Sequence, residues 1–515
     1  MQIHPTEAEF VKLARRGNVI PVYGELFADL ETPVSAFLKL DDGAFSYLLE
    51  SVQGPEKLAR YSFIGSRPRM LITGTSRHME ISEFRAGRLA RLRRFETSAD
   101  PLAELERLMR RFRAVPVPGL PRFCGGLVGY LGYDVVRFLE RLPPHQRDDL
   151  RVPDLMLMLS DTMAIFDHAQ HKLLLVANAI TTDASPRAAY RRAVRATHDM
   201  AARLRRSVPR APRRGGRRRV PATLRANLTR RDFTRMVERA KRSIRAGDII
   251  QVVLSQRWER RLACAPLDVY RALRSLNPSP YMFALRFGSL WLVGASPEML
   301  VRCEEGALET RPIAGTRRRG RTAEEDARRI RQLTTSPKER AEHLMLVDLG
   351  RNDLGRVAQV GSVKTPELMV VETYSHVLHL VSSVTARLRP GKTAFDVLRA
   401  TFPAGTVTGA PKVRAMEIIA GLERDDRGPY AGAVGYIGFS GNLDTCITIR
   451  TMLIKDGRAY VQAGAGIVAD SQPAREHLES INKVRALLQA IDRAEQRPGA
   501  AATAAAAAAA AGTRP

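Results

Sequence analysis

The chain has 515 residues, 44% of them hydrophobic, which is enough to bury a large core in about three domains or in one large body. Its 82 Lys and Arg exceed its 54 Asp and Glu and give a formal net charge of +28, which raises nucleic acid as a partner. The densest basic stretch, residues 203–219, has no aromatic residues to stack on bases, so we expect no nucleic-acid binding.

The cysteines and the apolar segments exclude several other classes of protein. The four cysteines are far apart and form no CxxC pair, which argues against a zinc knuckle, a thioredoxin-type site and a disulfide framework. Outside an alanine-rich tail there is no run of 18 apolar residues, and the N-terminal segment carries acidic residues. We therefore expect a soluble, cytoplasmic protein that does not associate with a membrane.

The first 200 residues mix strand-like and helix-like patterns and are expected to form an N-terminal region. Within them, residues 125–133 are rich in glycine and apolar side chains, which predicts a closely packed strand or turn. Residues 201–224 are rich in Arg, Pro and Gly and have little to bury, so we expect a linker or a solvated loop there.

Residues 225–494 have a clearer pattern and are expected to form a second domain. Thr229 is a plausible helix N-cap, with Asp232 three residues later, and Gly247 follows the expected end of that helix. Helices are predicted over 230–246, over 323–348 with a break near Ser336–Pro337, and over 474–494; strands are predicted over 248–256, over 430–470 and, as a pair, over 281–303. The grouping predicts an α+β fold with large antiparallel sheets sandwiched between helices, followed by a disordered Ala-rich tail over 495–515.

Two pairs of carboxylates lie at helical spacing on two of the predicted helices. Glu339 and Glu342 are three residues apart, and so are Glu476 and Glu479, so each pair projects from one helix face. Lys483 follows Glu479 by four residues. The apolar face of this last helix is expected to consist of Leu478, Ile481, Val484 and Leu488. Each pair alone is typical of a solvated helix face, but two pairs facing each other across a cleft would suit Mg²⁺ and an anionic substrate.

Two glycine-rich segments could bring their backbone close to a ligand. Residues 403–412 (PAGTVTGAPK) lead into a predicted helix, where backbone N–H groups and the helix dipole favour an anion. The segment lacks the Gly-Lys-Ser/Thr sequence of a Walker A loop. Residues 462–468 (QAGAGIV) contain glycines that allow close approach of a ligand, although either segment could simply form a tight turn.

Several long motifs, in the same order along the chain, resemble the chorismate-utilising enzyme family and, within it, the component I subunits of anthranilate synthase. These motifs are residues 348–356 (DLGRNDLGR), 405–412 (GTVTGAPK) and 462–468 (QAGAGIV). The strong resemblance covers roughly 225–490, and a weaker one includes residues 48–51 (LLES). It implies a chorismate-binding enzyme fold, in which 225–494 is the catalytic domain and 1–200 carries part of a tryptophan regulatory site.

The resemblance also implies roles for individual residues. Glu342 and Glu479 are expected to bind Mg²⁺, with Glu339 and Glu476 beside them directly or through water, so that the metal holds the ring carboxylate of chorismate. The residues expected to contact chorismate are Thr406, Tyr430, Arg450, Gly464, Gly466 and Lys483. Among these, the fork of an arginine is a suitable grip for the enolpyruvyl carboxylate.

The implied reaction is the attack of ammonia at ring C2 with loss of the C4 hydroxyl, followed by elimination of pyruvate to give anthranilate. Glu339 or Glu476 is expected to protonate the leaving hydroxyl, and Thr406 is expected to assist. His379 matches the family histidine that is tied to the elimination step, although from the sequence alone a packed core histidine is the more common explanation.

Two positions distinguish this chain from other members of the family. Relatives that use water carry a lysine base where this chain has Gln251, which argues against an isochorismate or salicylate synthase. Aminodeoxychorismate synthase typically carries a nucleophilic lysine where this chain has Ala314, so amination at the ortho position is favoured. A 2-amino-2-deoxyisochorismate synthase, which stops before pyruvate loss, remains an alternative, and a nucleic-acid-binding protein is a distant one.

The resemblance further implies a protein partner and a feedback inhibitor. Cys124 lies in Phe-Cys-Gly-Gly and not in the nucleophile elbow of a glutamine amidotransferase, so ammonia is expected from a separate amidotransferase subunit, component II, in a heterotetramer. Tryptophan is the expected inhibitor. Its candidate contacts are Glu50, Ser51, Pro280, Tyr281 and Met282, with Val434 and Tyr436 opposite them.

Overall fold

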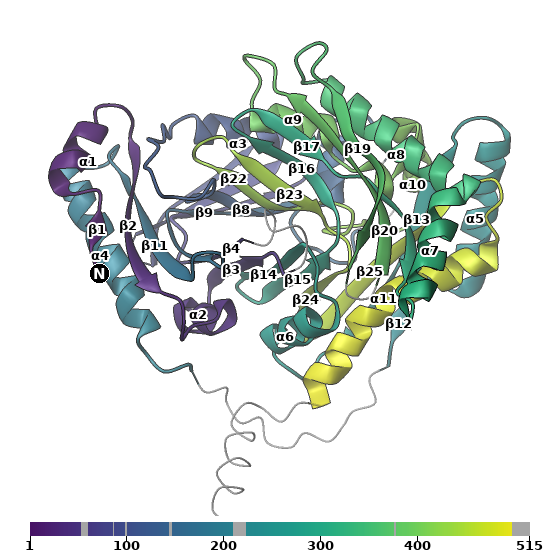
Figure 1. Ribbon diagram of the computed structural model, residues 1–515, viewed down its shortest axis with the longest axis horizontal. Helices are drawn as coiled ribbons and strands as arrows, with labels where there is room; N and C mark the ends of the chain where they lie inside the picture. The colour runs from purple at the N-terminus through teal and green to yellow at the C-terminus, as the bar shows by residue number, and fades with distance from the viewer. Residues whose placement is uncertain are drawn as a thin grey trace, which may run out of the picture.

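Two large antiparallel sheets form the centre of the structure, and helices cover their outer faces (Figure 1). This computed structural model describes residues 1–52, 60–85, 87–97, 100–143, 147–209, 223–374 and 377–496. The architecture confirms the predicted α+β class with large antiparallel sheets sandwiched between helices.

The first sheet has 13 strands. In spatial order they are β1 (Ile3–His4), β2 (Val19–Phe27), β11 (Lys172–Ile180), β10 (Thr162–Asp167), β4 (Tyr61–Ser66), β3 (Phe45–Glu50), β14 (Tyr281–Phe287), β15 (Leu290–Ser296), β24 (Thr451–Lys455), β25 (Arg458–Ile467), β13 (Gln251–Arg261) and β12 (Arg225–Ala226), with β21 (Gly409–Ala410) also paired to β13.

The second sheet has 12 strands. In spatial order they are β18 (Ile313–Arg318), β20 (Val377–Arg387), β17 (Ala307–Thr310), β16 (Met299–Glu304), β23 (Leu443–Ile447), β22 (Ala433–Gly438), β8 (Gly126–Leu131), β9 (Leu155–Ser160), β5 (Met70–Thr75), β6 (His78–Arg85) and β7 (Arg88–Glu96), with β19 (Lys364–Thr373) also paired to β20.

The helices are distributed over both outer faces. They are α1 (Glu7–Leu13), α2 (Pro33–Leu40), α3 (Pro101–Met109), α4 (Pro186–Leu204), α5 (Arg230–Arg245), α6 (Pro266–Leu276), α7 (Ala323–Thr335), α8 (Pro337–Gly355), α9 (Ala394–Thr401), α10 (Lys412–Leu422) and α11 (Pro473–Gln496), with short 3₁₀ turns η1 (Tyr133–Phe138) and η2 (Gly405–Val407). Helices α2, α4, α6 and α11 pack on the first sheet, α3, α8 and α9 on the second, and α5 and α10 on β13 and β25.

Large side chains from both sheets fill the space between them. Tyr47, Phe63 and Phe283 of the first sheet pack with Tyr130 and Met158 of the second, and all five are at least nine-tenths buried. Burying a side chain of this size contributes about 2–3 kcal/mol, so this layer stabilises the pairing of the sheets.

The N-terminal and C-terminal parts of the sequence share both sheets. Strand β14 pairs with β3 in the first sheet, with Phe283 opposite Leu49, and β22 pairs with β8 in the second, with Gly435 opposite Gly129. A Cβ on Gly129 would lie 2.0 Å from the carbonyl oxygen of Met156, so the strands approach too closely for a side chain. This confirms the prediction that residues 125–133 contain a closely packed strand.

Most predicted elements of the second region are found, with shifted ends. The Thr229 cap is present as a complete capping box with Asp232, and Ser336–Pro337 does separate α7 from α8, with Ser336 as the N-cap of α8. The predicted pair of strands over 281–303 is wrong in number, because a third strand, β16, begins at Met299, where the chain enters the second sheet. Of the predicted linker, residues 201–204 belong to α4 and 210–222 lie outside the described residues, as do 497–515 of the predicted tail.

The predicted apolar face of the last helix is wrong at Leu478, whereas Ile481, Val484 and Leu488 do pack on the core. Leu478 is 53% exposed, and the buried face of α11 instead runs through Glu476, Ser480, Val484 and Leu487. Steps of three and four residues connect these positions, so a carboxylate occupies the place on the inner face where an apolar residue would be expected. A buried carboxylate at that place indicates a polar site beneath α11.

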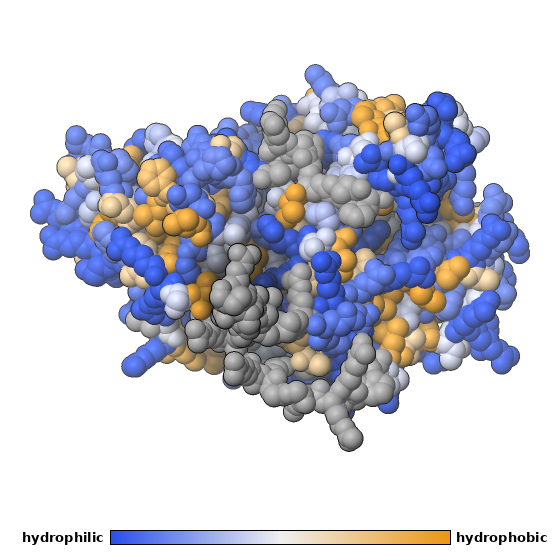
Figure 2. Space-filling view, turned by 60° about the horizontal axis from the view of Figure 1, so that its bottom comes forward, coloured by the Kyte–Doolittle hydropathy of each residue, from blue (hydrophilic) through white to orange (hydrophobic). Residues whose placement is uncertain are grey.

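The surface is mainly hydrophilic. Figure 2 shows one face on which hydrophilic side chains predominate and apolar ones gather in smaller patches. Among the described residues, no helix has both the length and the apolar character needed to cross a membrane.

Candidate functional site

The predicted site residues come from elements that lie together at one end of the two sheets. Helix α8 packs on β18 and β20, and α11 packs on β25 (Figure 1). The turn η2 touches α8, β13 and β25, so the 405–410 segment lies between the two carboxylate-bearing helices and the first sheet. The structure therefore brings together parts of the chain that are more than 200 residues apart.

The α8 carboxylates lie close to that of Glu479. Glu342 is largely buried, and this burial raises its pKa; the negative charges of Glu339 and Glu479 raise it further. The Glu342 carboxylate accepts a hydrogen bond from Nε2 of Gln251 at 3.4 Å. The Glu339 carboxylate forms an ion pair with Arg317 at 2.9 Å. The crowding of like charges around Glu342 favours a cation at this position.

The α11 carboxylates form the opposite side of this cluster. Glu476 is 8% exposed, and burial raises its pKa against the opposing effect of a hydrogen bond from Ser471. Glu479 pairs with Lys483 at 2.8 Å, and the same ammonium group donates to the carbonyl oxygen of Gly464 at 2.9 Å. Lys483 thus ties α11 to the glycine-rich part of β25.

The donor atoms of the four glutamates fit Mg²⁺ in kind, since hard divalent cations prefer carboxylate oxygens. In the part of the chain that the structure describes, no three Asp, Glu, His or Cys side chains are already grouped closely enough to hold a metal ion. Burial and the neighbouring like charges raise the pKa values of Glu342 and Glu476, and a divalent cation would offset both effects.

Arg450 and Tyr430 form a cationic and aromatic corner. Among the described residues, no hydrogen bond or ion pair engages the Arg450 guanidinium, and burial lowers its pKa. The carboxylates of Glu298 and Glu479 act on it in the opposite direction. A half-buried guanidinium with free donors is suited to bind a carboxylate in the bidentate manner.

The glycines of β25 make room for this corner. A Cβ on Gly464 would lie 3.1 Å from the Tyr430 hydroxyl and 2.6 Å from the carbonyl oxygen of Leu254. A Cβ on Gly466 would lie 2.4 Å from Nε2 of Gln251. Both positions therefore require glycine because side chains that line the site approach the backbone.

Glu298 is a site residue that the sequence analysis missed. It follows β15, is 4% exposed, and accepts a hydrogen bond from Oγ1 of Thr406 at 2.7 Å. Burial raises its pKa to about 7, although Thr406 and the charge of Arg450 act in the opposite direction. A carboxyl group that is half-protonated near neutral pH is a suitable general acid. A lone glutamate in Ser-Pro-Glu gives no periodic signal in one sequence.

His379 lies on β20 and is 9% exposed. Its Nδ1 is 3.0 Å from Oγ1 of Thr316, and the ring of Tyr374 packs edge-on against it at 5.5 Å between centroids. Burial, helped by the charge of Arg450, lowers its pKa to about 4. The imidazole is therefore neutral at physiological pH, with Nδ1 beside the threonine hydroxyl.

Gln251 has an unpaired acceptor in the site. Its side chain is 5% exposed, and Oε1 is buried without a hydrogen-bond partner. A buried amide oxygen usually accepts a hydrogen bond, so this oxygen is available to a ligand that carries N–H or O–H groups.

A buried ion pair holds the 405–409 segment in place. Arg427 is wholly buried, forms two hydrogen bonds with Glu423 at 2.7 and 2.8 Å, and donates to the carbonyl oxygen of Val407 at 2.7 Å. The rings of Tyr133 and Tyr430 lie 4.6 and 5.7 Å from its guanidinium carbon. Because every contact of Arg427 is to a fixed group, the ion pair orients both the segment after Thr406 and the Tyr430 ring.

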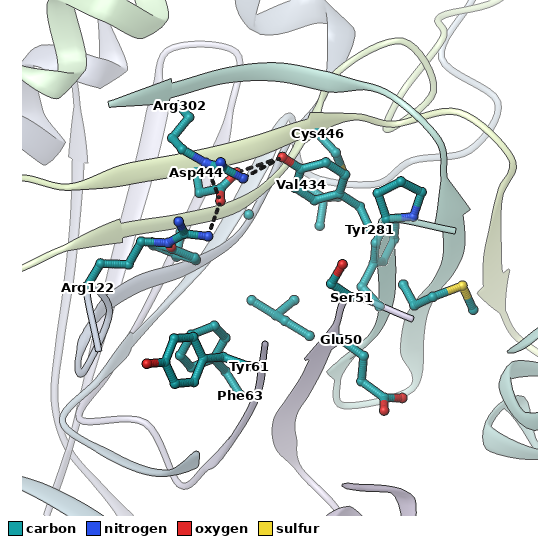
Figure 3. A pocket seen from close by; sticks show the side chains of 16 residues that line it. Glu50, Ser51, Tyr61, Phe63, Arg122, Tyr281, Arg302, Val434, Asp444 and Cys446 are labelled. Atoms are coloured by element: carbon teal, nitrogen blue, oxygen red, sulfur yellow. Dashed lines mark hydrogen bonds and ion pairs between the residues drawn. The ribbon is translucent and has the colours of Figure 1, made fainter. Parts of the chain in front are cut away.

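A separate cavity lies between the two sheets and is shown in Figure 3. It has an empty volume of about 580 Å³, its open mouth included. All seven residues predicted to bind tryptophan line it: Glu50, Ser51, Pro280, Tyr281, Met282, Val434 and Tyr436. The Ser51 hydroxyl is buried there without a hydrogen-bond partner, so it is available to bind a polar group of a ligand.

One end of this cavity is polar in a way that the sequence did not predict. Asp444 accepts hydrogen bonds from Tyr281 at 2.9 Å, Arg302 at 3.1 Å and Arg122 at 3.2 Å, and Figure 3 shows these groups gathered at one side. The carboxylate of Glu50 points away and binds Tyr270 and Arg274 instead. Glu50 therefore lines the cavity with atoms other than its carboxylate, and the carboxylate links β3 to α6.

Comparison with known proteins identifies the family of this chain. The family model described as chorismate binding enzyme matches residues 49–489. The chain belongs to the chorismate-binding enzymes. It is 49% identical to anthranilate synthase component 1 of Pseudomonas aeruginosa over 95% of this chain and 99% of that protein, and 46% identical to that of Acetivibrio thermocellus over the same shares.

Solved structures agree with this membership. Anthranilate synthase component I of Streptococcus pneumoniae is 36% identical, with a TM-score of 0.73 over 90% of this chain and 99% of that chain. The menaquinone-specific isochorismate synthase of Escherichia coli is 19% identical, with a TM-score of 0.67 over 94% and 98% of the chains, and shows a shared fold. The predicted family and fold of this chorismate-binding enzyme are confirmed.

Proposed function

We propose that this chain is the large subunit of an anthranilate synthase, which converts chorismate and ammonia to anthranilate and pyruvate in the first committed step of tryptophan synthesis. The observation that carries the proposal is the arrangement of Arg450, Glu298 and the four glutamates around one site, in a chain that is up to 49% identical to anthranilate synthases over nearly its full length. We also assign the chain to the cytoplasm, a reducing compartment in which its four free cysteines are ordinary.

The site is suited to hold both carboxylates of chorismate. Arg450 and Tyr430 would bind the enolpyruvyl carboxylate, with backbone groups at Gly464 and Gly466 close by. Glu342 and Glu479, with Glu339 and Glu476, would hold Mg²⁺, which would neutralise their charge and that of the ring carboxylate. Thr406 and the backbone of its segment would complete the contacts to that carboxylate.

Glu298 is the best candidate for the group that protonates the leaving C4 hydroxyl. Its pKa of about 7 keeps a large share of it protonated at neutral pH, and Thr406 fixes its orientation. Glu339, one of the two acids expected from the sequence, is instead held in an ion pair with Arg317. Glu476 remains the second candidate because burial raises its pKa too.

Gln251 and His379 account for the other steps. The unpaired Oε1 of Gln251 can accept a hydrogen bond from ammonia and so orient its lone pair toward C2, but a neutral amide cannot deprotonate water. In the second step the proton on C2 is removed and the bond to the enolpyruvyl oxygen breaks, which releases pyruvate. The neutral imidazole of His379 would accept this proton, with Thr316 beside Nδ1 to hold the ring in place.

Two further proposals concern partner and inhibitor. Ammonia would come from a glutamine amidotransferase subunit, component II, in a heterotetramer. Tryptophan would bind in the cavity of Figure 3, where Tyr61, Phe63 and Tyr436 offer aromatic walls and Ser51 offers a free hydroxyl. Strand β23 runs from Asp444 at that cavity toward Arg450 at the catalytic site, which would let one site influence the other.

A single incubation tests the proposal. The purified chain is mixed with chorismate, Mg²⁺ and ammonium at alkaline pH, with and without tryptophan, and the products are identified by fluorescence and mass. Anthranilate and pyruvate, suppressed by tryptophan, are expected. An aminated product that keeps its enolpyruvyl group would reassign the chain to a 2-amino-2-deoxyisochorismate synthase, and no loss of chorismate would refute the enzymatic proposal.

A further inference from the structure

A third cavity lies beneath helix α4, away from the two sites described above. Its empty volume is about 1650 Å³, open mouth included, against about 580 Å³ for the cavity of Figure 3, so it has room for a small molecule. Its walls come from α4, from the end of α2, from strands β10 and β11, and from the β4–β5, β6–β7 and β9–β10 connections. It shares no lining residue with the cavity of Figure 3.

The cavity has an apolar interior and a charged rim. Its apolar wall includes Ile64, Phe84, Met163, Met200 and five alanines of α4 and β11 among other residues. Its charged lining residues are Arg67, Arg69, Arg85, Arg192 and Arg203, against Asp161, Asp183 and Asp199. Positive charge therefore exceeds negative charge around an otherwise apolar space.

Arg203 is the most informative of these residues. It is 6% exposed, yet its only hydrogen bond among the described residues is to the carbonyl oxygen of Leu40, and it has no ion pair with any of them. Burial lowers its pKa, as does the nearby charge of Arg67, whereas the carboxylates of Asp199 and Asp42 act in the opposite direction from beyond ion-pair distance. A buried guanidinium with no direct ion pair is costly, so an anion in the cavity would stabilise it.

Two other arginines of the rim differ in how fully their charge is balanced. Arg67 lines the cavity and has a positive φ of 53°, a backbone conformation that non-glycine residues rarely adopt. Its ion pairs with Asp42 and Asp199 are long, at 3.5 and 3.6 Å. Arg69 is closely paired with Asp183 and so balances one of the three acids.

We propose that this cavity binds a small organic anion, with its phosphate or carboxylate group at Arg203 and Arg67 and its apolar body against the alanine-rich wall. An arginine fork recognises either group, and the apolar wall selects a molecule larger than a free inorganic ion. The proposal does not depend on the chorismate reaction, because none of these residues belongs to the catalytic site.

Isothermal titration of the full-length chain with phenyl phosphate and with inorganic phosphate tests the proposal. Phenyl phosphate is expected to bind saturably and about tenfold more tightly than inorganic phosphate, because only it can bury an apolar ring. Arg203→Gln should weaken phenyl phosphate about tenfold or more, whereas Arg195→Gln, which removes an exposed charge from the same helix, should not.

A second variant separates binding from stability. Ala196→Leu leaves every charge in place but fills the cavity, so it should also weaken phenyl phosphate, and its thermal unfolding midpoint shows whether the chain remains folded. Inorganic phosphate binding as tightly as phenyl phosphate would refute the role of the apolar wall. Equal affinity in all variants, displacement of the probe by tryptophan, or no saturable binding up to roughly 10 mM would overturn the proposal.

Discussion

Replacing Glu298 by Gln should lower activity and, at the same time, make the free energy of unfolding less dependent on pH. In the folded chain burial raises the pKa of Glu298 from 4.5 to about 7. Holding this carboxyl group in its charged form therefore costs about 3 kcal/mol of the free energy of unfolding. The sign follows from the raised value: the stabilising contribution is complete below about pH 4.5, falls as pH rises toward 7, and is lost above it.

The glutamine variant cannot ionise, and it can still accept the hydrogen bond of Thr406. Urea unfolding at about pH 5 and pH 9 should show that the variant loses less stability than the wild-type chain between these values, by about 2–3 kcal/mol. Anthranilate formation should fall by about 10²–10⁴-fold, because the general acid is absent. The same change in stability with pH in both chains, or full activity in the variant, would refute the reasoning.

Four other changes test the remaining parts of the site. Arg450→Lys should raise KM for chorismate about tenfold or more in steady-state assays, because an ammonium group cannot form the bidentate hydrogen bonds of a guanidinium. Arg458→Lys, a matched change on β25, should not. Gly466→Ala should lower ammonia-dependent turnover while leaving tryptophan binding intact by calorimetry, since its Cβ would lie 2.4 Å from Nε2 of Gln251. Ser51→Leu should abolish inhibition by tryptophan and keep at least half of the turnover measured without inhibitor, because it fills the cavity of Figure 3; equal loss of both would contradict a separate regulatory site. Removing divalent cations with EDTA should abolish turnover, and Mg²⁺ should restore it in proportion to occupancy, whereas Ca²⁺ offers a longer ligand distance and should restore less.

The sequence predicted the fold class and most of the second region because caps, breaks and β-branched runs are local signals. Thr229 and Ser336 mark helix starts through short-range hydrogen bonds, and both predictions are confirmed. The third strand at Met299 was missed because only Pro297 and Glu298 separate it from β15, and the chain passes there from the first sheet to the second without a glycine-marked turn. The strand ends shifted for a similar reason, since pairing partners and not local propensity decide where a strand stops.

The site was predictable only where a pattern extended over several residues. Glu342 and Glu479 stood out through helical spacing and the resemblance, and the structure does place their charges close enough to affect each other. Glu298, Asp444 and Arg427 are single residues, and their importance comes from burial and from partners far along the chain. Such long-range contacts leave no periodic trace, so the three-dimensional structure is needed to find them.

The sharing of strands has a consequence for how the chain is made. Strand β3 has β14 as one neighbour, so its edge stays open until at least 237 further residues have left the ribosome, and β8 waits still longer for β22. Neither sheet can close during the synthesis of the first half, and loop-closure entropy makes such distant pairings slow. The growing chain therefore passes through a long period with apolar strand edges uncovered, which makes chaperone binding during synthesis and failure of separately expressed halves the expected behaviour.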